Sequence, residues 1–108
     1  FRFPDRKNPF RLKITDRHFF SISSGWLDLV TELIKELISI GWNKELSQCK
    51  EKFGGLRFYT NGLPNTGHDI IRKYENLSIE TCELCGKPGI LRQEHWMKTQ
   101  CDECYKKD

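Results

Sequence analysis

Residues 82–86 read CELCG and residues 101–104 read CDEC, so two Cys-x-x-Cys pairs stand near the end of this 108-residue chain, with fifteen residues between them. The two-residue gap within a pair lets both sulfurs face one metal ion at about 2.3 Å, and two such pairs complete a tetrahedron. Gly86, directly after the first pair, relieves crowding where backbone amides turn towards the sulfurs. We therefore expect one structural Zn²⁺, bound by Cys82, Cys85, Cys101 and Cys104.

Other roles for the cysteines fit the sequence less well. The odd total of five and the lack of an apolar signal segment disfavour disulfides. A redox-active dithiol would use one pair and leave the other idle. Four thiolates close the coordination shell of zinc, which argues against a catalytic ion. The remaining cysteine, Cys49, lies apart from both pairs and is expected to be a small buried residue.

The segment that joins the two pairs is expected to form a zinc ribbon. Residues 90–92 and 96–98 are long enough for two short strands between the pairs. A tail of 27 residues, 82–108, buries too little apolar surface to fold alone. Metal binding, of order 10 kcal/mol, should therefore supply much of its folding free energy.

Upstream of the cysteines, the sequence predicts an α+β core. Residues 26–38 place apolar side chains at spacings of three and four, which predicts a long helix that is capped by Ser23 or Ser24 and stops at Gly41. Residues 49–60 read CKEKFGGLRFYT, two alternating runs that predict a hairpin with its two-residue turn at Gly54-Gly55. A second, shorter helix is expected from near Thr66 to Tyr74.

The start of the chain is expected to form a basic arm and a first strand. Residues 1–18 hold six basic residues against two acidic ones, and residues 10–15 alternate as a half-buried strand does. Residues 18–22 are expected to form a second strand that pairs with the first as a hairpin. The chain then divides into this arm (1–18), an α+β core (19–81) and the zinc ribbon (82–108). The predicted fold is α+β, with small antiparallel hairpins, one long helix and one short helix.

Composition and charge limit the class of function. The formal net charge is +3 at pH 7, and four thiolates around one Zn²⁺ would lower it to about +1. Such a small surplus gives little attraction for phosphate backbones. No apolar run is long enough to span a membrane, so we expect a soluble, cytoplasmic protein with no membrane contact and no small-molecule substrate.

Basic and aromatic residues are the candidate contacts for a macromolecular partner. Trp, Tyr and Arg dominate the energetics of protein interfaces, so Trp96, Tyr59 and Arg57 are the expected anchors for a protein, the favoured partner. A nucleic acid is the alternative partner, with Tyr59 or Trp96 stacked on a base. The cations expected to meet its phosphates are Lys50, Lys52, Arg57, Arg72 and Lys73, with Arg11 and Lys13 of the first strand.

An enzymatic alternative is a divergent nuclease of the HNH type, in which zinc knuckles surround a histidine base. Glu94-His95 lies between the cysteine pairs, but only five residues separate His95 from Cys101. Tyr105 follows the last cysteine, so the expected ligands of a second metal are missing. His18 and His68 have no neighbours that suggest a hydrolytic triad. We therefore expect no catalytic residue.

The order of motifs resembles a group of small zinc-ribbon proteins found in bacteriophages, prophages and bacteria. The resemblance covers roughly residues 19–104 and rests on FFSISSGW at 19–26, KEKFGGLRFY at 50–59, TCELCG at 81–86 and CDEC at 101–104. It implies an architecture and a mobile-element setting, but no activity. In that setting the expected partner is a host protein, such as a component of a bacterial defence system, in the host cytoplasm. The N-terminal arm departs from the pattern.

Overall fold

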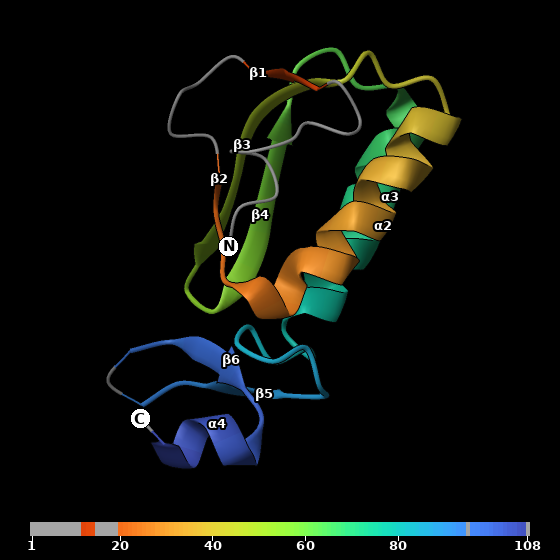
Figure 1. The fold of residues 1–108 in the computed structure, drawn as a ribbon. Helices are drawn as coiled ribbons and strands as arrows, with labels where there is room; N and C mark the ends of the chain where they lie inside the picture. Colours follow the sequence, from red (N-terminus) through yellow and green to blue (C-terminus); the bar gives the residue numbers. More distant parts are fainter. Residues whose placement is uncertain (1–11, 15–19, 95, 108) are drawn as a thin grey trace.

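The computed structural model describes residues 12–14, 20–94 and 96–107, in a mixed α+β fold with two small sheets (Figure 1). Most of the expected basic arm lies outside these residues, as do Arg11, His18 and His95. In chain order the elements are β1 (Lys13–Ile14), β2 (Phe20–Ser21), the 3-10 turn η1 (Ser24–Trp26), α2 (Leu27–Ser39), β3 (Glu45–Lys52), β4 (Gly55–Thr60), α3 (Asn65–Ser78), β5 (Ile90–Arg92), β6 (Lys98–Gln100) and α4 (Asp102–Lys107).

β3 is the central strand of the larger sheet. β4 pairs with one of its edges in antiparallel orientation. β1 and β2 both pair with the other edge in parallel orientation, β1 at Glu45–Leu46 and β2 at Cys49–Lys50. The expected hairpin between the first two strands is therefore wrong. Two strands of two residues each make too few bonds to support one another, whereas the eight-residue β3 offers both a full-length partner.

The β3–β4 hairpin is present, but its turn lies one residue earlier than expected. Lys52 pairs with Gly55, so the turn residues are Phe53 and Gly54. Their φ angles are +54° and +83°. Positive φ at both central residues is the signature of a type I′ turn, whose twist matches that of the strands. Gly55 is consequently the first paired residue of β4, and Phe53 occupies a backbone conformation that glycine would adopt more easily.

The core lies between one face of the larger sheet and the two helices α2 and α3, which run side by side in Figure 1. α2 buries the apolar stripe that the sequence predicts and is followed by Gly41, whose φ is +94°. Cys49 is completely buried, as expected, and burial raises the pKa of its thiol. The fully buried side chains of α2 are Val30, Leu33, Ile34 and Leu37.

α3 is not the shorter helix, which corrects a second expectation. It has 14 residues against 13 in α2, because its last turn covers the outer edge of β4. The Leu56 N–H donates to the Ser78 hydroxyl at 2.9 Å, and the Phe58 N–H donates to the Glu75 carboxylate at 3.3 Å. These contacts satisfy strand donors that would otherwise be left unpaired.

The cysteine-bearing residues 81–107, here called the cysteine module, follow α3. β5 and β6 pair as a two-stranded antiparallel sheet, and α4 was not predicted. Figure 1 shows the module below the end of the β3–β4 hairpin that carries the turn. Among the helices that the structure describes, none has the length and apolar character required to cross a bilayer.

Candidate metal centre

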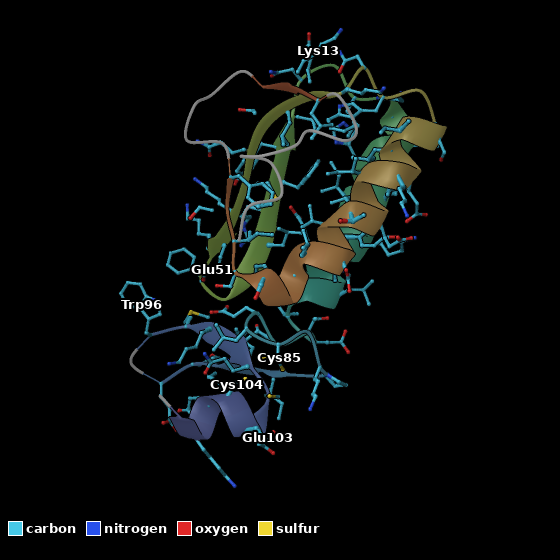
Figure 2. All side chains as sticks on the ribbon, in the orientation of Figure 1. Lys13, Glu51, Cys85, Trp96, Glu103 and Cys104 are labelled. Atoms are coloured by element: carbon cyan, nitrogen blue, oxygen red, sulfur yellow. The ribbon has the colours of Figure 1, made fainter. Side chains whose placement is uncertain are left out.

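The four cysteines that the sequence singles out converge at one point of the cysteine module. The Sγ atoms of Cys82, Cys85, Cys101 and Cys104 all lie within 4.8 Å of one another. Cys85 and Cys104 are labelled in Figure 2. The sulfurs of Cys85 and Cys101 are 3.6 Å apart. A tetrahedral site with metal–sulfur bonds of about 2.3 Å has sulfur–sulfur edges of about 3.8 Å. The cluster therefore has the size and the donor set of a four-thiolate metal site.

Local backbone structure brings each pair of sulfurs together. Cys82 begins a turn in which its C=O accepts from the Gly86 N–H at 2.9 Å and its N–H donates to the Lys87 C=O at 2.7 Å. Gly86 has a φ of +84°, a conformation that side chains disfavour, which explains a glycine directly after the pair. The second pair spans the end of β6 and the first turn of α4, where the Cys104 N–H faces the Cys101 sulfur at 3.5 Å.

The thiols influence one another's acidity. Burial raises the pKa of Cys82, but hydrogen bonds from the backbone amides of Cys101, Cys85 and Leu84 outweigh this effect and lower that pKa to about 6. A hydrogen bond with Cys101, followed by desolvation, raises the pKa of Cys104 to about 12. Crowded sulfurs of this kind do not all ionise together unless a cation lies between them. A metal ion bound at the centre of the cluster would allow all four thiols to ionise.

The first cysteine pair is docked onto the core by η1. The Gly25 N–H donates to the Glu83 C=O at 2.9 Å, and the fully buried Trp26 donates through Nε1 to the Thr81 C=O at 2.9 Å. A Cβ at Gly25 would lie 2.3 Å from the carbonyl oxygen of Cys82, so only glycine permits this approach. The cap expected from Ser23 or Ser24 is wrong. Neither η1 nor α2 has a side-chain cap hydrogen bond, and the Ser24 hydroxyl donates to the Leu84 C=O at 3.3 Å instead.

The hairpin turn forms a second contact with the cysteine module. The hydroxyl of Thr99, which is fully buried, donates to the Gly54 C=O at 2.7 Å. A Cβ at Gly54 would lie 2.5 Å from a methyl carbon of Leu91 and 3.2 Å from the backbone nitrogen of Lys98. Gly25 of SSGW and Gly54 of KFGG therefore have a structural role that their sequence spacing did not reveal. They let two parts of the core touch the module that carries the sulfurs.

The structure gathers some of the predicted partner-binding residues and separates others. Lys50, Lys52, Arg57 and Tyr59 lie on the face of the β3–β4 hairpin that turns away from the helices, with Lys50 directly opposite Arg57. Tyr59 is exposed, and the ammonium of Lys50 lies 5.8 Å from the centre of its ring. Lys13 is also exposed, on β1.

Arg72 and Lys73 do not join this face, because α3 covers the opposite side of the sheet. Arg72 forms an ion pair with Asp69 at 3.2 Å, and Lys73 forms one with Glu36 at 2.9 Å. Hydrogen bonds with Tyr74 and then with Lys73 lower the pKa of Glu36. Both cations therefore already have carboxylate partners on the exposed surface of the helices.

Trp96 lies in the β5–β6 loop and is 74% exposed. It lines a cleft with three residues of the hairpin end, Glu51, Lys52 and Phe53, and with Met97. Sequence reasoning identified Trp96 and Lys52 but missed Phe53, Glu51 and Met97. The KFGG string could have identified Phe53 as a turn residue, because a two-residue turn can begin at Phe53 as well as at Gly54.

Glu94, the acidic residue of the nuclease alternative, lies beside α4. Its carboxylate accepts from the Tyr105 hydroxyl at 3.2 Å. Tyr105 also packs under the Arg92 guanidinium, whose carbon lies 4.4 Å from the ring centre, and Arg92 pairs with Asp102 at 2.8 Å. Glu94 thus belongs to a network that holds α4 against β5, while its neighbour His95 lies outside the described residues.

No family model matches this chain, and neither the curated proteins nor the solved structures contain a match. The resemblance to small phage and bacterial proteins therefore stays a prediction. The chain has a mixed α+β fold whose C-terminal module carries four cysteines that could hold a metal ion.

Proposed function

We propose that this protein is a zinc-binding interaction module without catalytic activity. In this proposal a Zn(Cys)₄ centre holds a zinc ribbon against the α+β core, and the exposed surface beside it binds another protein. The observation that carries the proposal is the convergence of four sulfurs in a module that is docked onto the core at Gly25 and Gly54. Bound zinc supplies positive charge and tetrahedral geometry, and the cysteines hold it.

The ligand set supports a structural zinc ion. Four soft thiolates in a tetrahedron suit Zn²⁺ or a single iron, and four protein ligands leave no position for water or substrate. Zinc has no redox chemistry of its own, so its contribution here is folding free energy. That contribution matters because β5 and β6 have only three residues each and build no core of their own.

A protein partner is favoured over a nucleic acid by the distribution of charge. The formal net charge of +3 falls to about +1 when zinc and four thiolates are counted. Two of the predicted cations, Arg72 and Lys73, form ion pairs within the fold. The resemblance to small phage and bacterial proteins adds a finer proposal. The partner is a host protein, such as a component of a bacterial defence system, and binding takes place in the host cytoplasm.

The test is a pull-down from bacterial lysate with the zinc-loaded chain. The lysate is divided, one half is treated with nuclease, and retained proteins are identified by mass spectrometry. We expect a stoichiometric protein that nuclease does not remove and that the double variant Cys85→Ser/Cys104→Ser fails to retain. Cys49→Ala is the matched cysteine control, because it leaves all four ligands in place. Retention of nucleic acid alone, or equal retention by the double variant, would contradict the proposal.

A separate assay addresses catalysis. The nuclease alternative predicts cleavage of plasmid DNA with Mg²⁺ or Mn²⁺, and loss of that cleavage in His95→Ala. Our proposal predicts no cleavage above background by either protein. Cleavage by the wild type that His95→Ala abolishes would replace the proposed function with the enzymatic one.

A further inference from the structure

A cleft of about 580 Å³ lies where the hairpin end meets the cysteine module. Among the residues that the structure describes, the walls come from the hairpin, with Glu51, Lys52 and Phe53, and from the β5–β6 loop, with Trp96 and Met97. Figure 2 shows Glu51 and Trp96 next to each other across this junction. Clefts of a few hundred Å³ with an apolar lining are typical of binding sites.

Both aromatic residues of the cleft are largely exposed to solvent. Phe53 is 63% exposed and Trp96 is 74% exposed. Phe53 also has a φ of +54°, which is unusual for a bulky residue and would be relaxed in glycine. Its ring is not part of the core cluster. A residue that is strained, apolar and exposed stabilises the free protein poorly, and such residues cluster at binding sites.

The described lining of the cleft contains one cation, Lys52, and one carboxylate, Glu51, and further cations lie beside it. The next two cations on the same face are Lys50 and Arg57, which lie directly opposite each other on β3 and β4. Like charges in this position repel. Neither Lys50 nor Arg57 forms an ion pair with a described carboxylate, and the Glu51 carboxylate is turned to the Gly54 N–H at 2.6 Å. Negative charge from a partner would relieve this repulsion.

We infer that this cleft binds a peptide segment of a partner protein in which a large apolar side chain is flanked by acidic residues. The apolar side chain enters between Phe53 and Trp96, and the acidic residues meet Lys52 and the Lys50–Arg57 pair. The inference rests on the proposed function and names the site and the partner chemistry that it uses. A peptide is favoured over a nucleic acid because most of the described lining is apolar (Phe53, Trp96 and Met97), and among the described residues only one cation, Lys52, lines the cleft itself.

The cleft also explains why a metal would matter for binding. Its two walls are joined by the hydrogen bond from Thr99 to Gly54 and by the contact of Gly54 with Leu91 and Lys98. Thr99 and Lys98 belong to β6, which leads directly into the ligand Cys101. Loss of the metal would loosen β6 and separate the walls. Peptide binding is therefore expected to depend on zinc although no ligand of the metal lines the cleft.

The test begins with selection from a random peptide display library on the immobilised, zinc-loaded full chain. Binders that also bind Trp96→Ser are removed. We expect the remaining peptides to share a Leu, Met, Phe or Trp within three positions of at least one Asp or Glu. Enrichment of basic peptides, of purely apolar peptides, or of none above background would overturn the inference.

The selected peptide is then synthesised with a fluorescent label, and its affinity is measured by anisotropy. Trp96→Ser, Phe53→Gly and Lys52→Glu should each weaken binding at least tenfold, and chelation of the zinc should do the same. Lys52→Glu should regain affinity for a peptide whose acidic residues are replaced by lysine. Matched controls are Leu77→Ser, an exposed apolar residue of α3 that does not line the cleft, and Arg72→Glu. Both should stay within twofold of wild type.

The outcomes separate this inference from the proposed function. If the lysate partner is retained equally by wild type and Trp96→Ser, the module binds elsewhere and the cleft is wrong. If the cleft binds a labelled oligonucleotide and Trp96→Ser abolishes that binding, the partner class is wrong. Zinc content and the melting temperature of each variant are measured first. Phe53→Gly removes backbone strain, so loss of binding by that variant cannot be attributed to unfolding.

Discussion

Gly25→Ala tests the docking of the cysteine module on η1, because Gly25 lies very close to the first cysteine pair. An added Cβ would lie 2.3 Å from the Cys82 carbonyl oxygen and 2.5 Å from the Glu83 carbonyl carbon. Both are backbone atoms, so a side-chain rotation cannot relieve the clash. The module must instead move away from η1, by roughly 1 Å if ordinary contact distances are to be restored.

Such a movement breaks two hydrogen bonds of 2.9 Å, from the Gly25 N–H to Glu83 and from the Trp26 indole to Thr81. Each net hydrogen bond contributes about 1 kcal/mol, and leaving the buried indole N–H without a partner adds about 1 kcal/mol or more. We therefore expect Gly25→Ala to lower the free energy of unfolding of the zinc-loaded protein by about 3 kcal/mol, a large share of a typical total.

The assay is urea unfolding followed by tryptophan fluorescence at fixed free zinc, together with zinc affinity from competition with a chromophoric chelator. Gly41→Ala is the matched control. At Gly41 a Cβ would touch nothing within 4 Å, but φ is +94°, so that variant bears backbone strain of about 1 kcal/mol without a clash. It should leave zinc affinity unchanged, whereas Gly25→Ala should lower it. A Gly25→Ala protein within 0.5 kcal/mol of wild type would refute the docking geometry, because this contact leaves no room for a methyl group.

Three further predictions follow from other contacts. Phe53→Gly should raise the melting temperature by about 2–4 °C, because relief of the strain at a φ of +54° outweighs the extra freedom of glycine in the unfolded chain. A melting temperature below that of wild type in calorimetry would mean that the Phe53 ring stabilises the free protein. Thr99→Val should cost about 1–3 kcal/mol in urea unfolding, because the buried Gly54 carbonyl loses its donor, while the exposed Ser39→Ala should change little. Burial, and then Glu36, raise the pKa of Tyr74 from 10.0 to about 12, so its contribution to stability is complete below pH 10 and is lost as the pH rises towards 12. The melting temperature should therefore fall more between pH 9 and pH 11 in wild type than in Tyr74→Phe, and equal slopes would contradict the raised pKa of Tyr74.

Local patterns predicted the elements that depend on short sequence spacing. The Cys-x-x-Cys pairs bring their sulfurs together because two intervening residues set the turn, and the apolar stripe of α2 follows from helical periodicity alone. Cys49 was correctly expected to be buried. In each case the physical cause lies within a few residues of the pattern.

Features that depend on contacts between distant segments were missed. β1 and β2 look like a hairpin in sequence, but each gains more from β3, which lies later in the chain. The last turn of α3 covers the edge of β4 through hydrogen bonds to its backbone. The sequence of residues 75–78 has no apolar periodicity that would predict these contacts. In the sequence alone, Gly25 and Gly54 resemble ordinary turn residues, because their contacts with the cysteine module depend on the tertiary fold. The cleft between Phe53 and Trp96 could not be found for the same reason, since its walls are 43 positions apart in sequence.

X-ray absorption at the zinc edge of the purified, zinc-loaded chain tests the four-cysteine centre most directly, combined with elemental analysis of the same sample. We expect one zinc ion per chain with four sulfur neighbours at about 2.3 Å and no directly bound nitrogen or oxygen. Cys49→Ala should give the same spectrum. A chain that holds no stoichiometric metal, or a spectrum that requires nitrogen or oxygen ligands, would contradict the account.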